Sequence, residues 1–373
     1  MAHTVADLFL RNMGWSEKHG YYTMCMVFFT YSELALTLLF IISTCLSIVY
    51  SRENLSMHLH GLLWLLVEIH VFAVTANRLY HKSKLRDMHQ RSQKVRIPEN
   101  YRRTIANVLT YHMSLPNVLV AIPALYMILL DGVQMGDPFT FPFVDVLPIK
   151  TTSVTVYVCK YIVYAMPVYI GQLETCFLNV SFMYYTGVVK RHFQILEEQV
   201  AEAMVNKDEQ KLKIAIKSHQ EVLKYFKDMK TVSEIPILVN IEFCSFYVCL
   251  TCCYVIQAMQ GFINQMILGI IIHTSIAGIT TITIYCIYAS NMYDLHNGIL
   301  NALFEHRSCY SRNKSFTQLI LLMKTKATIL LEFKAGFIFT LNLNLLVKIF
   351  RFAYTVFNVL LTSTNRQFKE SAI

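Results

Sequence analysis

The chain alternates between long apolar runs and shorter charged stretches. A helix needs about 20 apolar residues to cross a hydrocarbon layer about 30 Å thick. Seven runs reach that length and lack the strict alternation of β-barrel strands. They cover residues 22–50, 56–80, 105–130, 153–186, 231–260, 264–290 and 335–362. We therefore predict an all-α membrane protein with seven transmembrane helices.

Prolines interrupt several of these runs, among them Pro116, Pro167 and Pro236. A proline inside a helix leaves the carbonyl group four residues earlier without its usual donor. Membrane helices tolerate this where neighbouring elements satisfy the freed carbonyl. We therefore expect neighbours to satisfy the carbonyls freed in these spans.

Composition argues against a soluble enzyme. The 373 residues are 55% apolar and 15% charged, with a mean hydropathy of +0.42, whereas soluble domains usually carry about 25% charged residues. No Ser-His-Asp set, carboxylate pair or phosphate loop is present, so we expect no catalytic residues and no cofactor. Most cysteines lie inside the apolar runs, as small apolar side chains do, and we expect no metal site.

Basic residues are distributed unequally between the segments that join the runs. With the N-terminus in the cytosol, the inside segments hold 26 of the 33 Lys and Arg residues, and the outside segments hold 4. Because positive charge accumulates on the cytosolic side, we predict a cytosolic N-terminus and an extracellular C-terminus. This orientation is the reverse of a G-protein-coupled receptor. The basic residues flank the membrane, so we expect no nucleic-acid partner.

The outside segments carry two further signals. Asn54-Leu55-Ser56 lies in the first outside loop and predicts a glycosylation site at Asn54. A second sequon, at Asn179, lies inside a span, where we expect no glycosylation. The loop 131–152 contains three Pro and three Phe residues. It is either a rigid lid on the outer helix ends or a lid over an outward-facing ligand site.

The inside segment 187–230 is charged, but its apolar residues recur at helical spacing. We predict helical extensions of the fourth and fifth spans. Their apolar face must be buried, either on another subunit or on the last cytosolic stretch of the chain, where residues 316–332 predict a further, non-spanning helix. The apolar positions are Phe193, Leu196, Val200, Met204, Leu212, Ile216, Leu223 and Phe226.

The seventh run contains polar residues in steps of four and three, which lie on one helical face. These residues are Asn344, Lys348, Arg351, Thr355, Asn358 and Thr362, here called the polar stripe. A Lys or Arg at the centre of a lipid-facing helix costs at least about 2.5 kcal/mol, so the polar stripe must face protein or water. It is either a seam between helices, with the basic side chains reaching toward the cytosol, or one wall of a water-filled path.

Polar and aromatic groups gather in the outer halves of the second, third, fourth and sixth spans. Such groups either pack the core and the membrane interface or line a ligand pocket. The candidates are His60, Trp64, Val120, Ala124, Tyr157, Tyr161, Tyr164, Val168, His273, Thr274 and Ala277. Glu68 and Lys160 are expected to pair, because a charge inside the membrane needs a partner.

Two stretches resemble insect odorant receptors. Residues 283–291, Thr-Ile-Tyr-Cys-Ile-Tyr-Ala-Ser-Asn, are similar to the end of that family's sixth span, and residues 335–361 are similar to its final helix. The seven spans, the inside N-terminus and the Pro/Phe-rich outside loop agree with this family. The sister family of gustatory receptors ends in a Thr-Tyr…Gln-Phe motif, where this chain has Ala353-Tyr354 and Leu360. This difference favours an odorant receptor.

The resemblance implies a subunit of a tetrameric, odorant-gated, non-selective cation channel in the plasma membrane of sensory neuron dendrites. In this family a ligand-specific subunit pairs with a shared co-receptor, whose second cytosolic loop contains a long insertion. Residues 187–230 are too short for that insertion, so we expect the odour-tuning subunit. The resemblance also implies an odorant pocket among spans two, three, four and six, and a hydrophobic gate at Phe357 and Leu361.

We therefore expect three regions: a ligand-pocket region (residues 1–186), an anchor and assembly region (residues 187–334), and the pore helix with a short outside tail (residues 335–373). The expected ligands are small, mostly apolar volatiles, including molecules with one aromatic ring and a single polar group. Two alternatives remain. One is a gustatory-type receptor that forms its own tetramer, and the other is a membrane protein that binds or scaffolds without conducting.

Overall fold

A computed structural model describes residues 31–32, 34–46, 55–95, 97–116, 154–259, 265–305, 314–328, 331–336 and 338–371. Helices dominate these residues, which confirms the all-α prediction. After an apolar helix at Leu34–Leu46, the elements are α3 (Leu55–Tyr80), α4 (Lys82–Ser92), α5 (Glu99–Pro116), α7 (Val154–Asn206), α8 (Glu209–Met259), α9 (Gln265–Glu305), α10 (Lys314–Ala327), β1 (Lys334–Ala335), β2 (Phe339–Thr340) and α11 (Leu343–Ser371).

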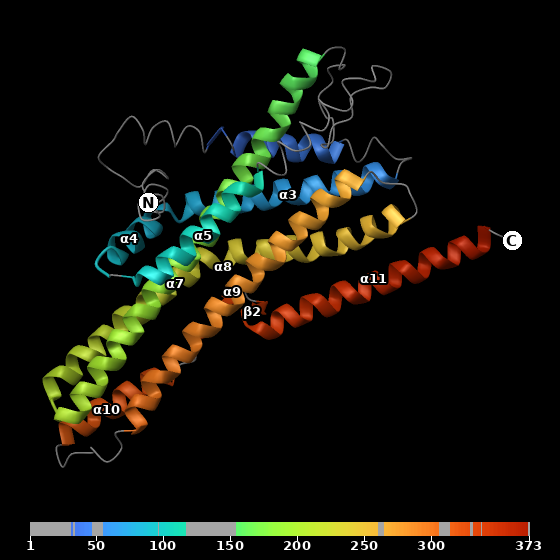
Figure 1. Ribbon diagram of the computed structural model, residues 1–373. Helices are drawn as coiled ribbons and strands as arrows, with labels where there is room; N and C mark the ends of the chain where they lie inside the picture. The colour runs from blue at the N-terminus through green and yellow to red at the C-terminus, as the bar shows by residue number, and fades with distance from the viewer. Residues whose placement is uncertain are drawn as a thin grey trace.

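The helices α7, α8 and α9 are much longer than a membrane is thick. With 53 residues at 1.5 Å per residue, α7 is about 80 Å long, against a hydrocarbon layer of about 30 Å. All three run to one end of the molecule, where α10 lies (Figure 1). We call this end the anchor bundle: residues 187–230 and 291–305 with α10. The predicted helical extensions are therefore confirmed as helices.

Apolar side chains fill the anchor bundle. Val200, Met204 and Leu212 are completely buried, and Ile216 and Leu223 pack against the same core. Their partners include Leu303 of α9 and Ile320 of α10. The apolar face of 187–230 therefore packs on α9 and α10 of the same chain, which agrees with the second of the two predicted alternatives.

Two described helices are both long and apolar enough to cross a membrane, over Glu209–Ile256 and Ile272–Phe304. The shorter helix Leu34–Leu46 lies in the first predicted run. The third predicted run is described as a helix up to Pro116. The outside loop 131–152 and the predicted glycosylation site at Asn54 lie outside the described residues.

The helix predicted for the seventh run is wrong at its beginning. Lys334–Ala335 and Phe339–Thr340 pair as two antiparallel strands instead of helix, with Lys334 opposite Thr340. The turn between them contains Gly336 at φ +58°, a left-handed conformation that glycine adopts without strain. The helix α11 begins only at Leu343, where the Asn342 side chain accepts a 3.0 Å hydrogen bond from the backbone N–H of Leu345. Asparagine is a favoured N-cap residue for this reason.

Candidate functional site

One face of α11 attaches it to its own chain. Leu345, Ile349 and Ala353 are buried, and α11 packs on α8 and α9 through this face. The spacing of four residues keeps these side chains on one side of the helix. Toward its C-terminal end α11 extends away from the other helices (Figure 1).

The polar stripe lies on a different side of α11 and is solvent-accessible in the single chain. Lys348, Arg351 and Thr355 are exposed, and Asn358 is half-buried. The Thr355 hydroxyl donates a 2.9 Å hydrogen bond to the Arg351 carbonyl within the same helix. The polar stripe therefore does not pack against the described helices of its own chain. It faces water, lipid or another chain.

A third face of α11 is apolar and equally exposed. Leu343, Val347, Phe350 and Tyr354 expose 45 to 68% of their surface. Phe357, on the predicted gate, is half-buried, and the side chain of Leu361 lies outside the described residues. A large exposed apolar face marks a surface that contacts protein or membrane.

The predicted ligand residues are described only partially. Tyr157 and Tyr161 are buried, and their ring centroids lie 6.1 Å apart on α7. Ala277 is buried, and His273 is half-buried. The residues Val120 and Ala124, and the side chains of His60, Trp64, Tyr164 and Val168, lie outside the described residues.

Helix packing already occupies some of the polar groups in the outer half of α9. Thr274 hydrogen-bonds the Tyr247 side chain of α8. The neighbouring Ser275 lies 2.5 Å from the Thr251 hydroxyl, also on α8. This segment of the predicted sixth span therefore turns these two hydroxyls toward the fifth span.

The expected pair between Glu68 and Lys160 is wrong. The Glu68 carboxylate instead accepts bonds of 3.3 and 3.5 Å from the Thr44 hydroxyl, on the apolar helix that precedes α3. The Thr44 hydroxyl therefore provides the hydrogen bond that the buried Glu68 carboxylate needs.

A buried ion pair forms between Arg78 of α3 and Glu174 of α7. The guanidinium donates two bonds to the carboxylate, of 2.8 and 2.5 Å. The bidentate geometry is the strongest that an arginine and a carboxylate can form. This pair was not predicted, because Arg78 lies at the end of the second predicted run and resembles a membrane-flanking basic residue. The isolated acidic residue at position 174, inside an apolar run, was the available signal.

A second polar network joins α7, α8 and α9 inside the apolar core. Asn240 of α8 donates a 3.1 Å bond to the Tyr285 hydroxyl of α9, and Tyr285 donates to the side-chain oxygen of Asn179 on α7. All three side chains are buried. Tyr285 belongs to the stretch 283–291 that carries the family resemblance, so this stretch builds a contact among three helices. Asn179 is engaged in this network, which agrees with the expectation that its sequon is not used.

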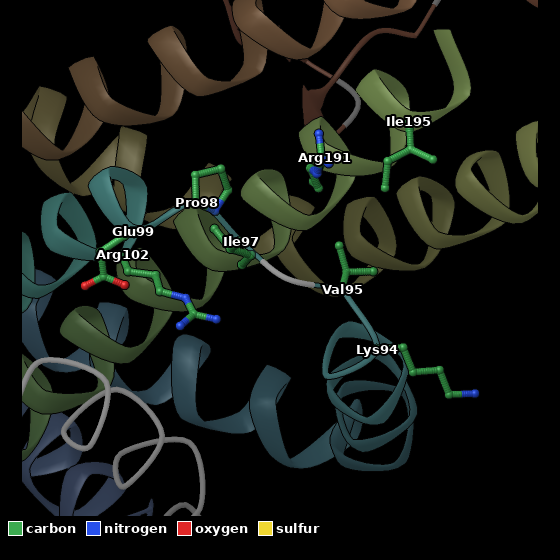
Figure 2. A pocket seen from close by; sticks show the side chains of 8 residues that line it. All are labelled: Lys94, Val95, Ile97, Pro98, Glu99, Arg102, Arg191 and Ile195. Atoms are coloured by element: carbon green, nitrogen blue, oxygen red, sulfur yellow. The ribbon is translucent and has the colours of Figure 1, made fainter. Parts of the chain in front are cut away.

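A surface cleft of about 390 Å³ lies beside the C-terminal half of α7 (Figure 2). It is lined by Lys94, Arg102 and Arg191, with Glu99 as the acidic lining residue. Arg102 and Glu99 come from α5, and Arg191 comes from α7. From Tyr161 to Arg191 the helix rises by about 45 Å, so this cleft is separate from the predicted odorant pocket.

Comparison with known proteins identifies the class. Residues 68–354 match the family described as 7tm odorant receptor, and the chain therefore belongs to the odorant receptor family, a membrane-embedded receptor family. The sequence matches no curated protein.

Solved structures with the same fold include the insect olfactory receptor OR5 from Machilis hrabei. In its complex with eugenol, OR5 aligns with a TM-score of 0.76 at 14% identity, covering 97% of both chains. Another OR5 structure aligns with a TM-score of 0.70 at 15% identity, covering 96% of this chain and 97% of OR5. At this identity the similarity shows the fold.

Proposed function

We propose that this chain is the odour-tuning subunit of an odorant-gated, non-selective cation channel in the plasma membrane of insect sensory neuron dendrites. It crosses the membrane seven times with a cytosolic N-terminus and pairs with the odorant receptor co-receptor in a tetramer. Membership of the odorant receptor family supports this proposal, and so does the fold that the chain shares with OR5.

The surface of α11 is the observation that carries the channel proposal. One face of the helix packs on α8 and α9, while the polar stripe and the apolar face opposite the packing side are exposed. An amphipathic helix in a membrane requires a wet or protein surface for its polar side. Four copies around a central axis supply both a water-filled path for the polar stripe and protein contacts for the apolar face.

The basic residues of the polar stripe favour a mixed tetramer. A homotetramer would bring four copies each of Lys348 and Arg351 to one axis, and like charges repel strongly in a narrow path of low dielectric constant. A single copy among neutral co-receptor subunits avoids this repulsion. Charge at these positions therefore supports pairing with a different subunit.

The proposed ligand is a small, mostly apolar volatile that binds among spans two, three, four and six. The buried tyrosines Tyr157 and Tyr161, with His273 on a second helix of the proposed pocket, would give an aromatic lining with few polar groups, as small-molecule sites have. OR5 was solved with eugenol, a small aromatic molecule with polar oxygen substituents.

Expression alone and with the co-receptor, against a panel of volatiles, tests this function. We expect odour-evoked cation current only when both chains are present. Robust current from this chain alone would contradict the co-receptor requirement and support a receptor that forms its own tetramer. Odorant binding without current in either condition would support a non-conducting binding protein.

A further inference from the structure

A small cavity lies where α3, α7 and α8 meet. Its volume is about 30 Å³, and its polar lining comes from Asn77 and Arg78 of α3, Ser181 and Tyr185 of α7, and Ser233 of α8. Pro236 of α8 lies in the same wall. The cavity therefore joins two proposed ligand-binding helices to the interrupted turn of α8.

Two hydroxyl groups in this cavity are buried without a protein partner. Ser181 is 5% exposed and Tyr185 is 1% exposed. Neither hydroxyl finds a hydrogen-bond partner among the described residues. Nearly all buried polar groups are hydrogen-bonded to protein or to ordered water, because a buried hydroxyl without a partner is destabilising. Two such groups on one wall of one cavity point to a common ligand.

Water matches the size and the polarity of this cavity. One water molecule needs a cavity of about 10–15 Å³ and two to four polar partners. We propose that this cavity binds one or two water molecules, held by the hydroxyl groups of Ser181 and Tyr185 and by the polar side chains of α3, and that this hydrated cluster holds the proline turn of α8 in place.

The proline turn is already held from α3 by a direct bond. Pro236 has no N–H to donate to the Val232 carbonyl, four residues earlier. The Asn77 side chain donates a 2.8 Å hydrogen bond to that carbonyl. The freed carbonyl is thus satisfied by a neighbouring helix, as the sequence predicts. Water beside Asn77 would extend this contact to Ser181 and Tyr185 of α7.

The same turn of α8 holds the hairpin that leads into α11. The Glu234 carbonyl accepts a 3.1 Å bond from the backbone N–H of Gly336. A Cβ atom on Gly336 would lie 2.7 Å from a methyl carbon of Leu238, so hairpin and helix are in close contact. If α11 is the pore helix, which rests on the proposed function, the hydrated cluster lies between the odorant pocket and the pore.

Hydroxyl-radical footprinting of the purified full-length chain in H₂¹⁸O tests the water site without odorant or current. X-ray irradiation generates the radicals from bound water itself, so a buried side chain beside such water is oxidised. We expect oxidation of Tyr185 despite its burial. Tyr285, fully buried and bonded to Asn179 and Asn240, is the matched control and should resist. Equal, low labelling of both tyrosines would overturn the proposal.

The variant Tyr185→Phe gives a second test, in which the sign of the change in Tm decides between the two cases. Removing a hydroxyl that has no partner at all should raise the Tm or leave it unchanged, whereas removing one that holds water should lower the Tm by about 2–4 °C. We expect the decrease for Tyr185→Phe. The control Tyr254→Phe removes another buried, unpartnered hydroxyl outside this cavity and should show no decrease. An increase for Tyr185→Phe would overturn the proposal.

The link to gating is tested separately with Asn77→Ala and Tyr185→Phe in odour-evoked currents. We expect each variant to shift the half-maximal odorant concentration by about 2-fold to 30-fold. Unchanged half-maximal concentrations would overturn the gating role and leave the water site standing. Absent current in the unmodified chain, together with labelled Tyr185, would contradict the proposed channel function and not the water site.

Discussion

The anchor bundle and α11 bury their apolar residues in opposite ways. In the anchor bundle, Val200, Met204 and Leu303 are completely buried by side chains of the same chain. In α11, Val347 and Tyr354 remain 47 and 68% exposed. The core of the anchor bundle is therefore built within one chain, although Val205, Ile214 and Phe304 on its surface are 60, 58 and 51% exposed. The contrast is between a bundle with a core of its own and a single helix that packs on its chain through one face.

Charged residues show a similar contrast between the packed helices α3 and α7 and the exposed side of α11, and they give the largest expected effect. Arg78 and Glu174 are buried and paired, whereas Lys348 and Arg351 are exposed in the single chain. The variant Glu174→Ala leaves a buried arginine without its carboxylate, and removing one partner of a buried pair costs about 3–5 kcal/mol. We expect a matching loss of stability in thermal unfolding of the purified chain, with Lys348→Ala as the control that changes little.

A double variant shows whether the loss comes from the unpaired charge. Replacing both partners, as Arg78→Met with Glu174→Met, removes the charge together with its partner, and apolar replacements of buried pairs are often neutral or stabilising. The double variant should therefore be more stable than Glu174→Ala. Equal instability of both variants would mean that the pair itself, and not the orphaned charge, matters.

Leucine truncation compares the two regions directly. Leu303→Ala opens a space in the anchor bundle, and such truncations of buried leucines cost about 2–5 kcal/mol. Leu343→Ala, on the exposed face of α11, should change the stability of the single chain by at most about 0.5 kcal/mol. The midpoints of denaturant unfolding measure both. Comparable losses would show that α11 is buried in the chain after all.

Acid should destabilise the anchor bundle before α11, which contains no histidine. His219 and His296 stack with ring centroids 5.8 Å apart, and burial lowers the pKa of each to about 4, below about 6.5 in the unfolded chain. The unfolded state therefore binds more protons between these values. The contribution of this pair to stability should be constant above pH 6.5 and fall toward pH 4, by at most about 2.7 kcal/mol per pH unit.

Removing one histidine checks the origin of that acid sensitivity. His219→Phe keeps an aromatic ring in the stack but cannot be protonated. The slope of stability against pH between 6.5 and 4 should decrease by about the share of one histidine. A slope that is unchanged in this variant would assign the acid sensitivity to other groups.

Much of the anchor bundle could be predicted because apolar spacing and burial follow the same period. Phe193, Leu196 and Val200 were expected on one face, and all three are buried. The satisfied carbonyl near Pro236 was also expected, because the chemistry of proline requires a substitute donor. Which residue provides it could not be predicted, since Asn77 lies 155 residues away from Val232.

Contacts between distant residues account for the errors. The hairpin at 334–340 depends on the turn at Gly336 and on its bond to Glu234, which no local pattern indicates. Glu68 and Lys160 were paired by charge alone, while the Glu68 carboxylate accepts its hydrogen bond from the hydroxyl of Thr44. The ligand residues remain predictions, because a pocket depends on how four helices meet.

The smallest expected effect on stability is that of neutralising the basic residues of the polar stripe. Lys348→Gln with Arg351→Gln removes two exposed charges and should leave the unfolding midpoint nearly unchanged. Single-channel conductance should rise, or the permeation of divalent cations should change, because positive charge in a narrow path repels cations. Odorant potency should stay nearly constant. Unchanged conduction with reduced surface expression would indicate an anchoring role at the membrane boundary.

The most direct test of the account asks which face of α11 meets the permeating ions. Cysteines are placed one at a time on the polar stripe (Thr355→Cys), on the packed face (Ala353→Cys) and on the exposed apolar face (Tyr354→Cys), and odour-evoked current is recorded while a charged thiol reagent is applied. The account predicts that the reagent rapidly changes the current of Thr355→Cys and leaves that of Ala353→Cys unaffected. Rapid modification of Tyr354→Cys with a silent Thr355→Cys would contradict it and assign the pore to the apolar face.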